Sequence, residues 1–286
     1  MPLNRPAFLF VLVLASLAVP VLFTARATAQ SAEQQPIQDN SFLIEEAYNQ
    51  EDGVVQHINT FSRMWNSNDW VYTFTQEWPL PMDWRHQLSY TVAGVSSGSH
   101  PMAGTGFGDI ALNYRYQLVG SGETRTAFAP RITLLIPTGS AKDGRGCGGS
   151  GWQANLPLSV VVNRSVVTHW NLGGALVPHA NDGTGNHATA TGYNFGQSVI
   201  WLMRPNFNPM LETSYWGYQS VVGPQRTAWT NSWLISPGIR WAWNLSHGLQ
   251  IVPGVAVPIG VGPSHGERGV YAYLSFEHPF RSTTTR

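Results

Sequence analysis

Polar and apolar residues alternate along most of the chain after its first thirty residues. The alternation is clearest from residue 109 to residue 118, where Ile110, Leu112, Tyr114, Tyr116 and Leu118 stand between polar or small residues. A period of two places the apolar side chains on one face of a β-strand and the polar ones on the other. Segments with strand character predict twelve strands, at about residues 53–62, 70–78, 85–96, 108–119, 125–136, 152–162, 166–177, 192–203, 207–217, 228–242, 249–260 and 269–280.

The connections between these segments alternate in length. Those after even-numbered strands are short: residues 79–84, 120–124, 163–165, 204–206 and 243–248. Those after odd-numbered strands are mostly longer: residues 97–107, 137–151, 178–191, 218–227 and 261–268, with 63–69 as the exception. Outer-membrane barrels have short periplasmic turns and longer external loops, whereas a soluble, secreted β-sandwich has no reason to alternate. We therefore predict an all-β fold, an antiparallel transmembrane β-barrel of about twelve strands.

Aromatic residues gather near the ends of the predicted strands. The set comprises Trp78, Trp84, Trp152, Trp201, Tyr218, Trp229, Trp241 and Trp243. Amphipathic rings favour the two interfaces of a membrane, which predicts aromatic girdles. The alternative is that these rings pack a soluble core.

The N-terminus has the pattern of a secretory signal. Arg5 precedes an apolar run over residues 7–23, and Ala27-Thr28-Ala29 forms a small-x-small cleavage site. We predict a cleaved signal peptide over residues 1–29, the alternative being an uncleaved anchor helix. Residues 30–52 would be a periplasmic lead-in or a plug inside the lumen, residues 53–280 the barrel, and residues 281–286 a C-terminal tail.

Charge is scarce in this chain of 286 residues. Lys and Arg number 16, Asp and Glu number 16, and charged residues make up only 11% of the sequence. An ordinary soluble domain carries about 25%. The net charge of +0 argues against a nucleic-acid partner, which requires a basic surface. No apolar run after residue 30 reaches the length of about 18 residues that a transmembrane helix needs.

No cofactor or metal site is predicted. His179, Asp182 and His187 fall in a glycine-containing segment and fit a solvated loop better than a preorganised metal site. The glycine-rich residues 144–151 lack the Lys-Ser/Thr of a phosphate-binding loop. The single Cys147 cannot form an internal disulfide, and its place in the third outer loop predicts exposure to a membrane-impermeant maleimide.

The last strand ends in Phe280 and resembles the C-terminal assembly signal of outer-membrane barrels, although six residues follow it. This resemblance implies recognition by the barrel assembly machinery, with outer-membrane lipid as the surrounding partner. Five stretches, the last of them within this final strand, resemble a bacterial outer-membrane family of proposed transporters of the meta-pathway of phenol degradation: residues 106–118, 130–140, 153–159, 236–240 and 273–280. The resemblance implies a porin-like barrel that transports small, often aromatic or hydrophobic, solutes.

With the faces assigned by alternation, a polar set should line the lumen. The candidates are Asp109, Asn113, Arg115, Gln117, Arg131, Gln153, Asn155, His169, Asn171, Glu212, Arg240 and Glu277, together with Thr133 and Ser214. Charges of both signs could form a mixed-charge constriction. The alternative is a ladder of ion pairs that closes the lumen.

Function follows from this arrangement. Ser159, His169 and Asn171 could approach one another as in an outer-membrane hydrolase, but apolar neighbours argue against it, and we predict no catalytic residues and no enzyme. We expect a channel or transporter-like barrel in the bacterial outer membrane. The alternative is a non-conducting structural or surface-adhesive barrel.

Overall fold

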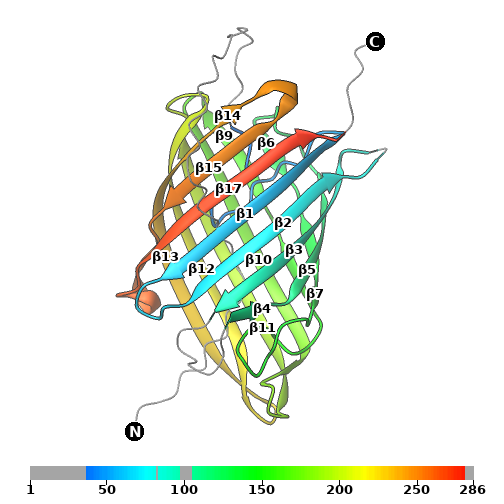
Figure 1. The fold of residues 1–286 in the computed structure, drawn as a ribbon, viewed down its shortest axis with the longest axis vertical. Helices are drawn as coiled ribbons and strands as arrows, with labels where there is room; N and C mark the ends of the chain where they lie inside the picture. Colours follow the sequence, from blue (N-terminus) through cyan, green and yellow to red (C-terminus); the bar gives the residue numbers. More distant parts are fainter. Residues whose placement is uncertain (1–36, 82, 97–104, 281–286) are drawn as a thin grey trace.

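The computed structural model describes residues 37–81, 83–96 and 105–280, which form a closed antiparallel barrel of twelve strands (Figure 1). The fold class predicted from the alternation is confirmed. The predicted signal peptide, the tail over residues 281–286 and part of the second outer loop lie outside the described residues.

Seventeen strand segments build the twelve strands of the barrel. Their bounds are β1 (Val54–Met64), β2 (Trp70–Pro79), β3 (His86–Ser96), β4 (Thr105–Phe107), β5 (Ile110–Tyr116), β6 (Thr126–Phe128), β7 (Arg131–Ile136), β8 (Gly151–Asn155), β9 (Leu158–Asn163), β10 (Val166–Asn181), β11 (His187–Trp201), β12 (Phe207–Gly223), β13 (Arg226–Trp241), β14 (Trp243–Asn244), β15 (Gln250–Ala256), β16 (Ile259–Gly260) and β17 (Gly269–Pro279). Two short 3₁₀ turns, η1 (Ser246–Gly248) and η2 (Gly262–Ser264), complete the described elements.

Five strands of the barrel are interrupted once, which explains why segments outnumber strands. Three of the interruptions contain a proline: Pro130 between β6 and β7, Pro157 between β8 and β9, and Pro258 between β15 and β16. Proline lacks the N–H that a ladder needs, so the pairing stops there and resumes on the same strand.

The barrel closes between its first and last strands. β1 pairs with β2 on one side and with β17 on the other, from Val54 opposite Pro279 to Met64 opposite Gly269. A closed sheet has no unpaired edge, which is the condition for strands to cross a membrane. Among the described residues, no helix has the length and apolar character to span a bilayer.

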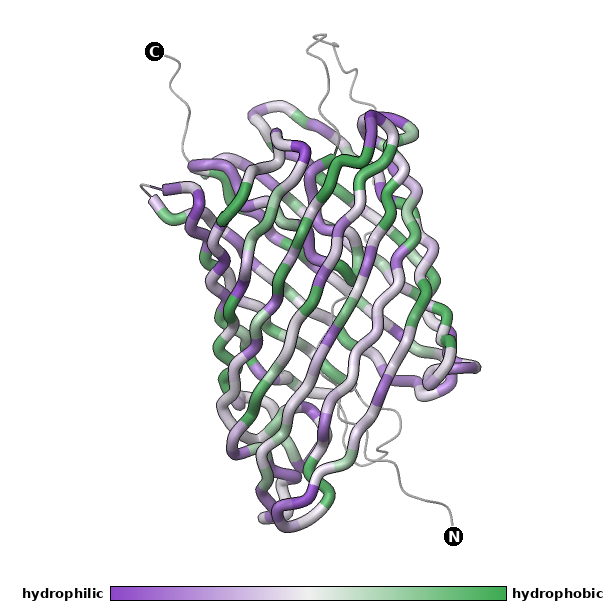
Figure 2. The backbone as a smooth tube through the Cα atoms, turned by 180° about the vertical axis from the view of Figure 1, so that it is seen from behind, coloured by the Kyte–Doolittle hydropathy of each residue, from purple (hydrophilic) through white to green (hydrophobic). Residues whose placement is uncertain are grey.

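Most polar side chains of the strands point inward, and most of the exposed outer surface is apolar. Leu112, Leu172 and Leu211 are exposed on the outer surface, whereas their neighbours Asn113, Asn171 and Glu212 are buried inside the barrel. Hydropathy alternates along the tube in Figure 2 accordingly. This is the reverse of a soluble sandwich, where the apolar face is hidden.

Two hairpins at the outer end are longer than the sequence predicted. β10 continues to Asn181 and β11 begins at His187. β12 ends at Gly223 and β13 begins at Arg226, so only two residues connect them. Residues 178–191 and 218–227 were predicted as loops, but most of them belong to strands. The reason is that backbone pairing in these two hairpins continues beyond the ends of the other strands (Figure 1).

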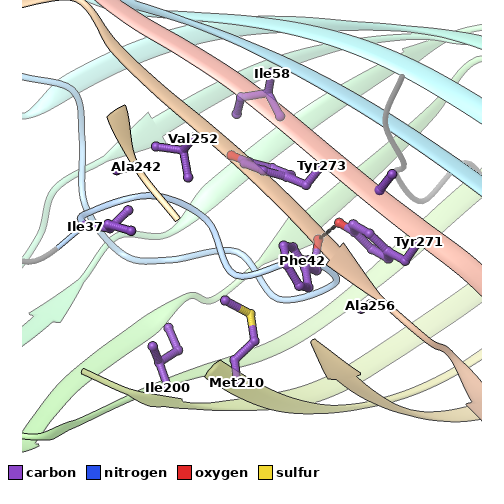
Figure 3. Packing of buried hydrophobic residues seen from close by; sticks show 11 residues of the cluster. Ile37, Phe42, Ile58, Ile200, Met210, Ala242, Val252, Ala256, Tyr271 and Tyr273 are labelled. Atoms are coloured by element: carbon purple, nitrogen blue, oxygen red, sulfur yellow. Dashed lines mark hydrogen bonds between the residues drawn. The ribbon is translucent and has the colours of Figure 1, made fainter. Parts of the chain in front are cut away.

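The segment before β1, residues 37–53, lies inside the barrel. Its apolar side chains pack on the inner wall: the Phe42 ring lies 4.7 Å from the Tyr271 ring and 5.9 Å from the Tyr273 ring, centroid to centroid (Figure 3). The Tyr271 hydroxyl donates a hydrogen bond of 2.5 Å to the Phe42 carbonyl oxygen. This segment, called here the inner segment, adds Ile37 and Phe42 to a core cluster whose other members come mostly from the strands.

Candidate functional site: the occupied lumen

Glycines on the inner wall make room for the inner segment. A Cβ atom at Gly238 or Gly254 would lie 2.5 or 2.4 Å from the Phe42 ring, and a Cβ at Gly196 would lie 2.2 Å from Ile44 Cδ1. Side chains at these positions would displace the segment. The absence of side chains there creates two hollows, one occupied by Phe42 and one by Ile44.

Arg115 of β5 holds the inner segment from one side. Its Nε donates to Asn49 Oδ1 at 2.9 Å, its Nη1 donates to the Glu46 carbonyl oxygen at 3.3 Å, and its Nη2 donates to the Tyr48 carbonyl oxygen. Nη1 also lies 3.3 Å from Glu45 Oε1. A single buried guanidinium thus satisfies backbone and side-chain acceptors over five consecutive residues.

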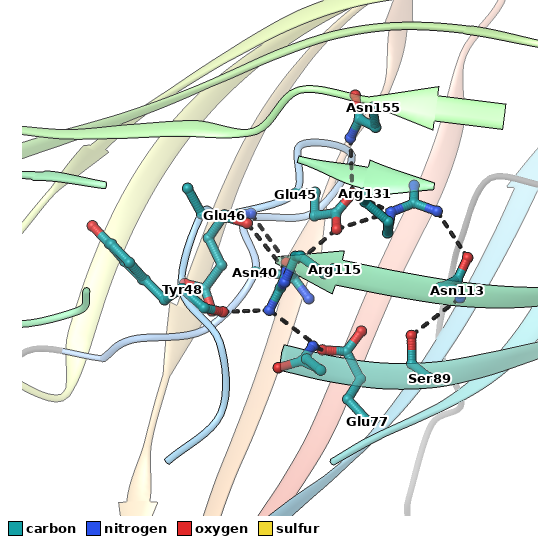
Figure 4. Close-up of polar contacts among 12 residues, drawn as sticks. Asn40, Glu45, Glu46, Tyr48, Glu77, Ser89, Asn113, Arg115, Arg131 and Asn155 are labelled. Carbon is teal, nitrogen blue, oxygen red and sulfur yellow. Dashed lines mark hydrogen bonds and ion pairs between the residues drawn. The ribbon is translucent and has the colours of Figure 1, made fainter. Parts of the chain in front are cut away.

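Glu45 is the charged centre of the inner segment (Figure 4). Arg131 Nε donates to both of its carboxylate oxygens, at 3.0 and 2.9 Å, and Asn155 Nδ2 donates to Oε2 at 2.8 Å. Burial alone would raise the pKa of Glu45, but Arg131 and Arg115 outweigh burial and the pKa is lowered. Asn171 fixes the backbone of the same residue, accepting from its N–H at 2.9 Å and donating to its carbonyl at 2.7 Å.

Glu212 and Arg240 hold the backbone in opposite ways. The Glu212 carboxylate accepts the N–H groups of Phe42, Leu43 and Ile44 at 2.7, 3.0 and 3.3 Å. Arg240 donates to the carbonyl oxygens of three other residues, Ile37 at 3.0 Å, Asn40 at 2.9 Å and Asp39. Charge-assisted bonds of this kind are stronger than neutral ones.

Neutral side chains hold the end of the segment. Gln117 accepts from the Asn49 N–H at 2.9 Å and donates to the Ala47 carbonyl at 2.8 Å. Ser159 Oγ accepts from the Ala47 N–H at 2.8 Å and lies 2.7 Å from His169 Nδ1. The hydrolase hypothesis had grouped Ser159 and His169 with Asn171, but Asn171 bonds Glu45 instead, and the serine and histidine are buried beneath the segment.

The remaining residues predicted to line the lumen do not contact the inner segment in the same way. Asn113 accepts from Arg131 Nη1 at 2.8 Å and so positions it. Gln153 lines a cavity described below. Glu277, near the end of β17, is half-buried. Among the described residues, no group of three or more His, Cys, Asp and Glu side chains is placed to hold a metal ion.

Sequence reasoning missed contacts from within the inner segment. Asp39 accepts hydrogen bonds from Gln56 Nε2 at 2.8 Å and from the hydroxyls of Tyr273 and Ser275. Burial raises the pKa of Asp39, although Arg240 and these donors oppose the shift. Tyr273 and Ser275 alternate with the apolar face of the last strand, so the same period-two argument could have placed them inside.

A cavity of about 270 Å³ lies between the inner segment and the outer loops. Leu43 and Glu45 border it on the segment side, and Arg145, Gly146 and Cys147 border it on the side of the third outer loop. Its walls carry uncharged polar groups, the charged side chains of Glu77, Asp109 and Arg131, and aromatic rings, among them Trp216 and Tyr218.

The placement of Tyr218 corrects one aromatic assignment. The sequence placed Tyr218 in a girdle at the membrane interface, but it is buried inside the barrel. It shares the inner face of β12 with Trp216, and their rings stack with centroids 5.4 Å apart and an angle of 23°. The reason is the two-residue period, since even-numbered residues of this strand point inward.

The third outer loop is tied to the mouth of the barrel by Asp109. Its carboxylate accepts the Gly139 N–H at 2.9 Å and the Cys147 N–H at 2.8 Å. Cys147 is half-buried and packs on the cluster of Leu135 and Val177. Burial and the nearby Asp109 raise the pKa of its thiol. The prediction of an unshielded thiol was therefore wrong, because the glycine-rich loop folds inward.

Comparison with known proteins supports the fold and no closer assignment. No protein-family profile and no curated protein matches the sequence. An outer-membrane channel of Pseudomonas putida F1 superposes with a TM-score of 0.56 at 11% identity, covering 81% of this chain and 97% of the other. The NanC porin superposes with a TM-score of 0.50 at 8% identity, covering 78% and 98%. The chain thus has the barrel fold that outer-membrane channels and porins share.

Proposed function

We propose that the protein is an outer-membrane channel for small solutes whose lumen is plugged by the inner segment. The observation that carries this proposal is that non-covalent polar groups, chiefly Arg115, Arg240 and Glu212, hold residues 37–50 across the interior. Such a segment can be displaced without breaking the sheet. The barrel fold and the outward apolar face support placement in the bacterial outer membrane, after export by the predicted signal peptide.

The solute class is part of the same proposal. The family resemblance suggests small aromatic or hydrophobic compounds, and the cavity offers the stacked rings of Trp216 and Tyr218 as an apolar surface. Outer-membrane lipid and the barrel assembly machinery remain the proposed partners.

A non-conducting structural barrel is the second candidate, because the same contacts fill much of the lumen. The two candidates differ in what happens when the segment is loosened. In a channel, loosening opens a path; in a structural barrel, it only lowers stability, since buried partners are left unpaired.

Planar-bilayer conductance of the purified barrel tests this. We expect low conductance for the wild type and a severalfold increase for the double variant Glu212→Ala/Arg240→Ala, which loses the two charged groups that bind the backbone of residues 37–44. Arg85→Ala is the matched control, since Arg85 pairs with Asp83 in an exposed turn. A double variant that remains closed while folded, with a lower melting temperature, supports the structural barrel and overturns the channel.

A further inference from the structure

The inner wall has a third hollow beside the two that hold Phe42 and Ile44. Ala175 of β10 and Gly192 of β11 are directly paired, so their small side chains share the inner face. The three atoms nearest to a Cβ atom placed at Gly192 all belong to the wall: Gly217 O at 3.2 Å, Tyr218 Cβ at 3.6 Å and Ala175 Cβ at 3.7 Å. None of these atoms belongs to the inner segment or the third outer loop, and both residues line the cavity.

Aromatic rings flank this third hollow on one side. Gly192 pairs with Tyr218, and Asn194, the next inward residue of β11, pairs with Trp216. The stacked Trp216 and Tyr218 rings therefore stand directly beside the small residues. A flat ligand lying in the hollow would bury apolar area against them.

Polar groups with unused hydrogen-bonding capacity surround the same hollow. Ser214 Oγ is buried with no hydrogen-bond partner, although Ser214 lines the cavity. The side chain of Gln153, a residue whose backbone pairs with that of Ala175, makes no hydrogen bond with any other described residue, and the side chain of Asn194 makes only one, at 3.5 Å. A buried polar group without a partner is unfavourable, so a ligand that supplies partners is favoured.

These groups are uncharged, and so are Thr75 and Thr91 on the far side of the cavity. The two threonines share one hydrogen bond of 2.8 Å, which leaves further acceptor positions on their hydroxyls. The charged side chains that also line the cavity already have partners. Glu45 pairs with Arg131 at 2.9 Å, and Glu77 lies 3.8 Å from Arg115. Asp109 accepts two backbone N–H groups, and Arg145 pairs with Asp143 at 2.7 Å. A neutral ligand with polar groups around its whole edge fits this surrounding better than an ion or an aromatic hydrocarbon.

We infer that this hollow is a binding site for a neutral, monosaccharide-sized cyclic polyol, such as a pyranose. Its C–H face lies on Trp216, its ring occupies the space over Gly192, and its hydroxyls pair with Gln153, Asn194 and Ser214. The inference deepens the proposed channel function by naming the solute class, and it differs from the aromatic class that the sequence suggested.

Ligand-observed NMR and calorimetry on the full-length barrel test the site. The detergent must carry no sugar headgroup, because a glycoside detergent would compete. We expect methyl α-D-glucopyranoside to bind, with glucuronate and toluene binding at least about tenfold more weakly, since one adds a charge and the other lacks hydroxyls.

Two pairs of variants make the test specific. Trp216→Ala should weaken pyranose binding about tenfold or more, whereas Trp229→Ala, an exposed outward tryptophan, should leave it unchanged. Gly192→Leu should abolish binding by filling the hollow. Gly174→Leu is its control: the backbone of Gly174 borders the cavity, but a side chain there points outward, and an added Cβ meets its nearest atom at 3.3 Å, much as at Gly192.

The outcomes separate this inference from the proposed channel. Stronger binding of toluene than of the pyranose, or pyranose binding that Gly192→Leu leaves intact, overturns the site. Absence of pyranose binding by a folded, conducting barrel overturns the site and leaves the channel standing. Pyranose binding without solute flux in liposome swelling supports the site and contradicts the channel.

Discussion

At the scale of single residues, Arg131 and Glu45 form the charge pair that borders the cavity. Replacing Arg131 with Ala leaves Glu45 with Arg115 as its remaining cationic partner, at 3.3 Å. Breaking a buried pair costs about 3 kcal/mol. We expect a lower melting temperature and, because a partly unpaired carboxylate now faces the cavity, a shift of the conducted current toward cations. Reversal-potential measurements check this, with Arg226→Ala at an exposed hairpin tip as the control; unchanged selectivity and unchanged stability would place the pair outside the conduction path.

A second residue-scale prediction concerns Glu46, whose Oε2 is buried without a hydrogen-bond partner. Burial, with the neighbouring Asp39 charge, raises the pKa of Glu46 well above its usual value, although Arg115 and Arg240 oppose the shift and Glu277 adds to it. A raised pKa means that the contribution of Glu46 to seating is fully present below the usual pKa of a glutamate and is lost as pH rises through the raised pKa, whereas Glu45, whose pKa is lowered, loses its contribution only as pH falls below the usual range. Conductance of the wild type should therefore increase with pH.

The variant Glu46→Gln tests this argument because it mimics the protonated acid. The conductance of this variant should remain low up to a higher pH than that of the wild type, and its conductance should depend less on pH. Some dependence of the same sign should remain, since the pKa of Asp39 is also raised. A profile identical to that of the wild type would mean that Glu46 does not govern seating.

At the scale of elements, the third outer loop depends on one carboxylate. Asp109→Ala removes the acceptor of the Gly139 and Cys147 N–H groups, so the loop should move away from the mouth. A membrane-impermeant maleimide should label Cys147 slowly in the wild type, because its thiol has a raised pKa, and severalfold faster in the variant. Asp182→Ala is the control, since Asp182 caps only its own turn. Equal labelling rates in both proteins would show that Asp109 does not hold the loop.

The inner segment gives a second prediction at this scale. Gly254→Val places a branched side chain where the Phe42 ring now lies, since even a Cβ would be 2.4 Å from it, whereas the wall atom nearest to that Cβ, Ile239 O, is 3.3 Å away. The barrel should still close, because Gly254 faces the lumen, but the segment should be displaced and conductance should rise. Limited proteolysis in detergent reports the displacement as new cleavage within residues 37–53; protection equal to that of the wild type would contradict the packing described here.

At the scale of the whole molecule, closure of β1 on β17 makes the barrel resist detergent. The unheated protein should migrate faster on a denaturing gel than the boiled protein, because a closed sheet has no edge from which unfolding can start. Material shown by circular dichroism to be rich in β-structure but with the same mobility before and after boiling would argue against a closed barrel.

The sequence by itself determined the barrel. Alternation such as that of Ile110, Leu112 and Tyr114 is a local property: each side chain's face is set by its position along one strand, whatever the partner strand is. The same property placed Arg115, Arg131, Arg240 and Glu212 on the polar face. Strand ends were less well determined, since the lengths of β10 to β13 depend on pairing partners and not on composition.

Tertiary structure alone decided what fills the lumen. The sequence left residues 30–52 open as a lead-in or a plug, because contacts such as Arg240 with Ile37 join residues about 200 positions apart and leave no periodic signal in either segment. The hollows at Gly196, Gly238 and Gly192 were equally hidden, since a glycine in a strand does not show what lies opposite it. The exposure of Cys147 was misjudged for the same reason. Its burial depends on Asp109, which lies between β4 and β5 and is 38 residues away in the sequence, and not on the glycines beside it.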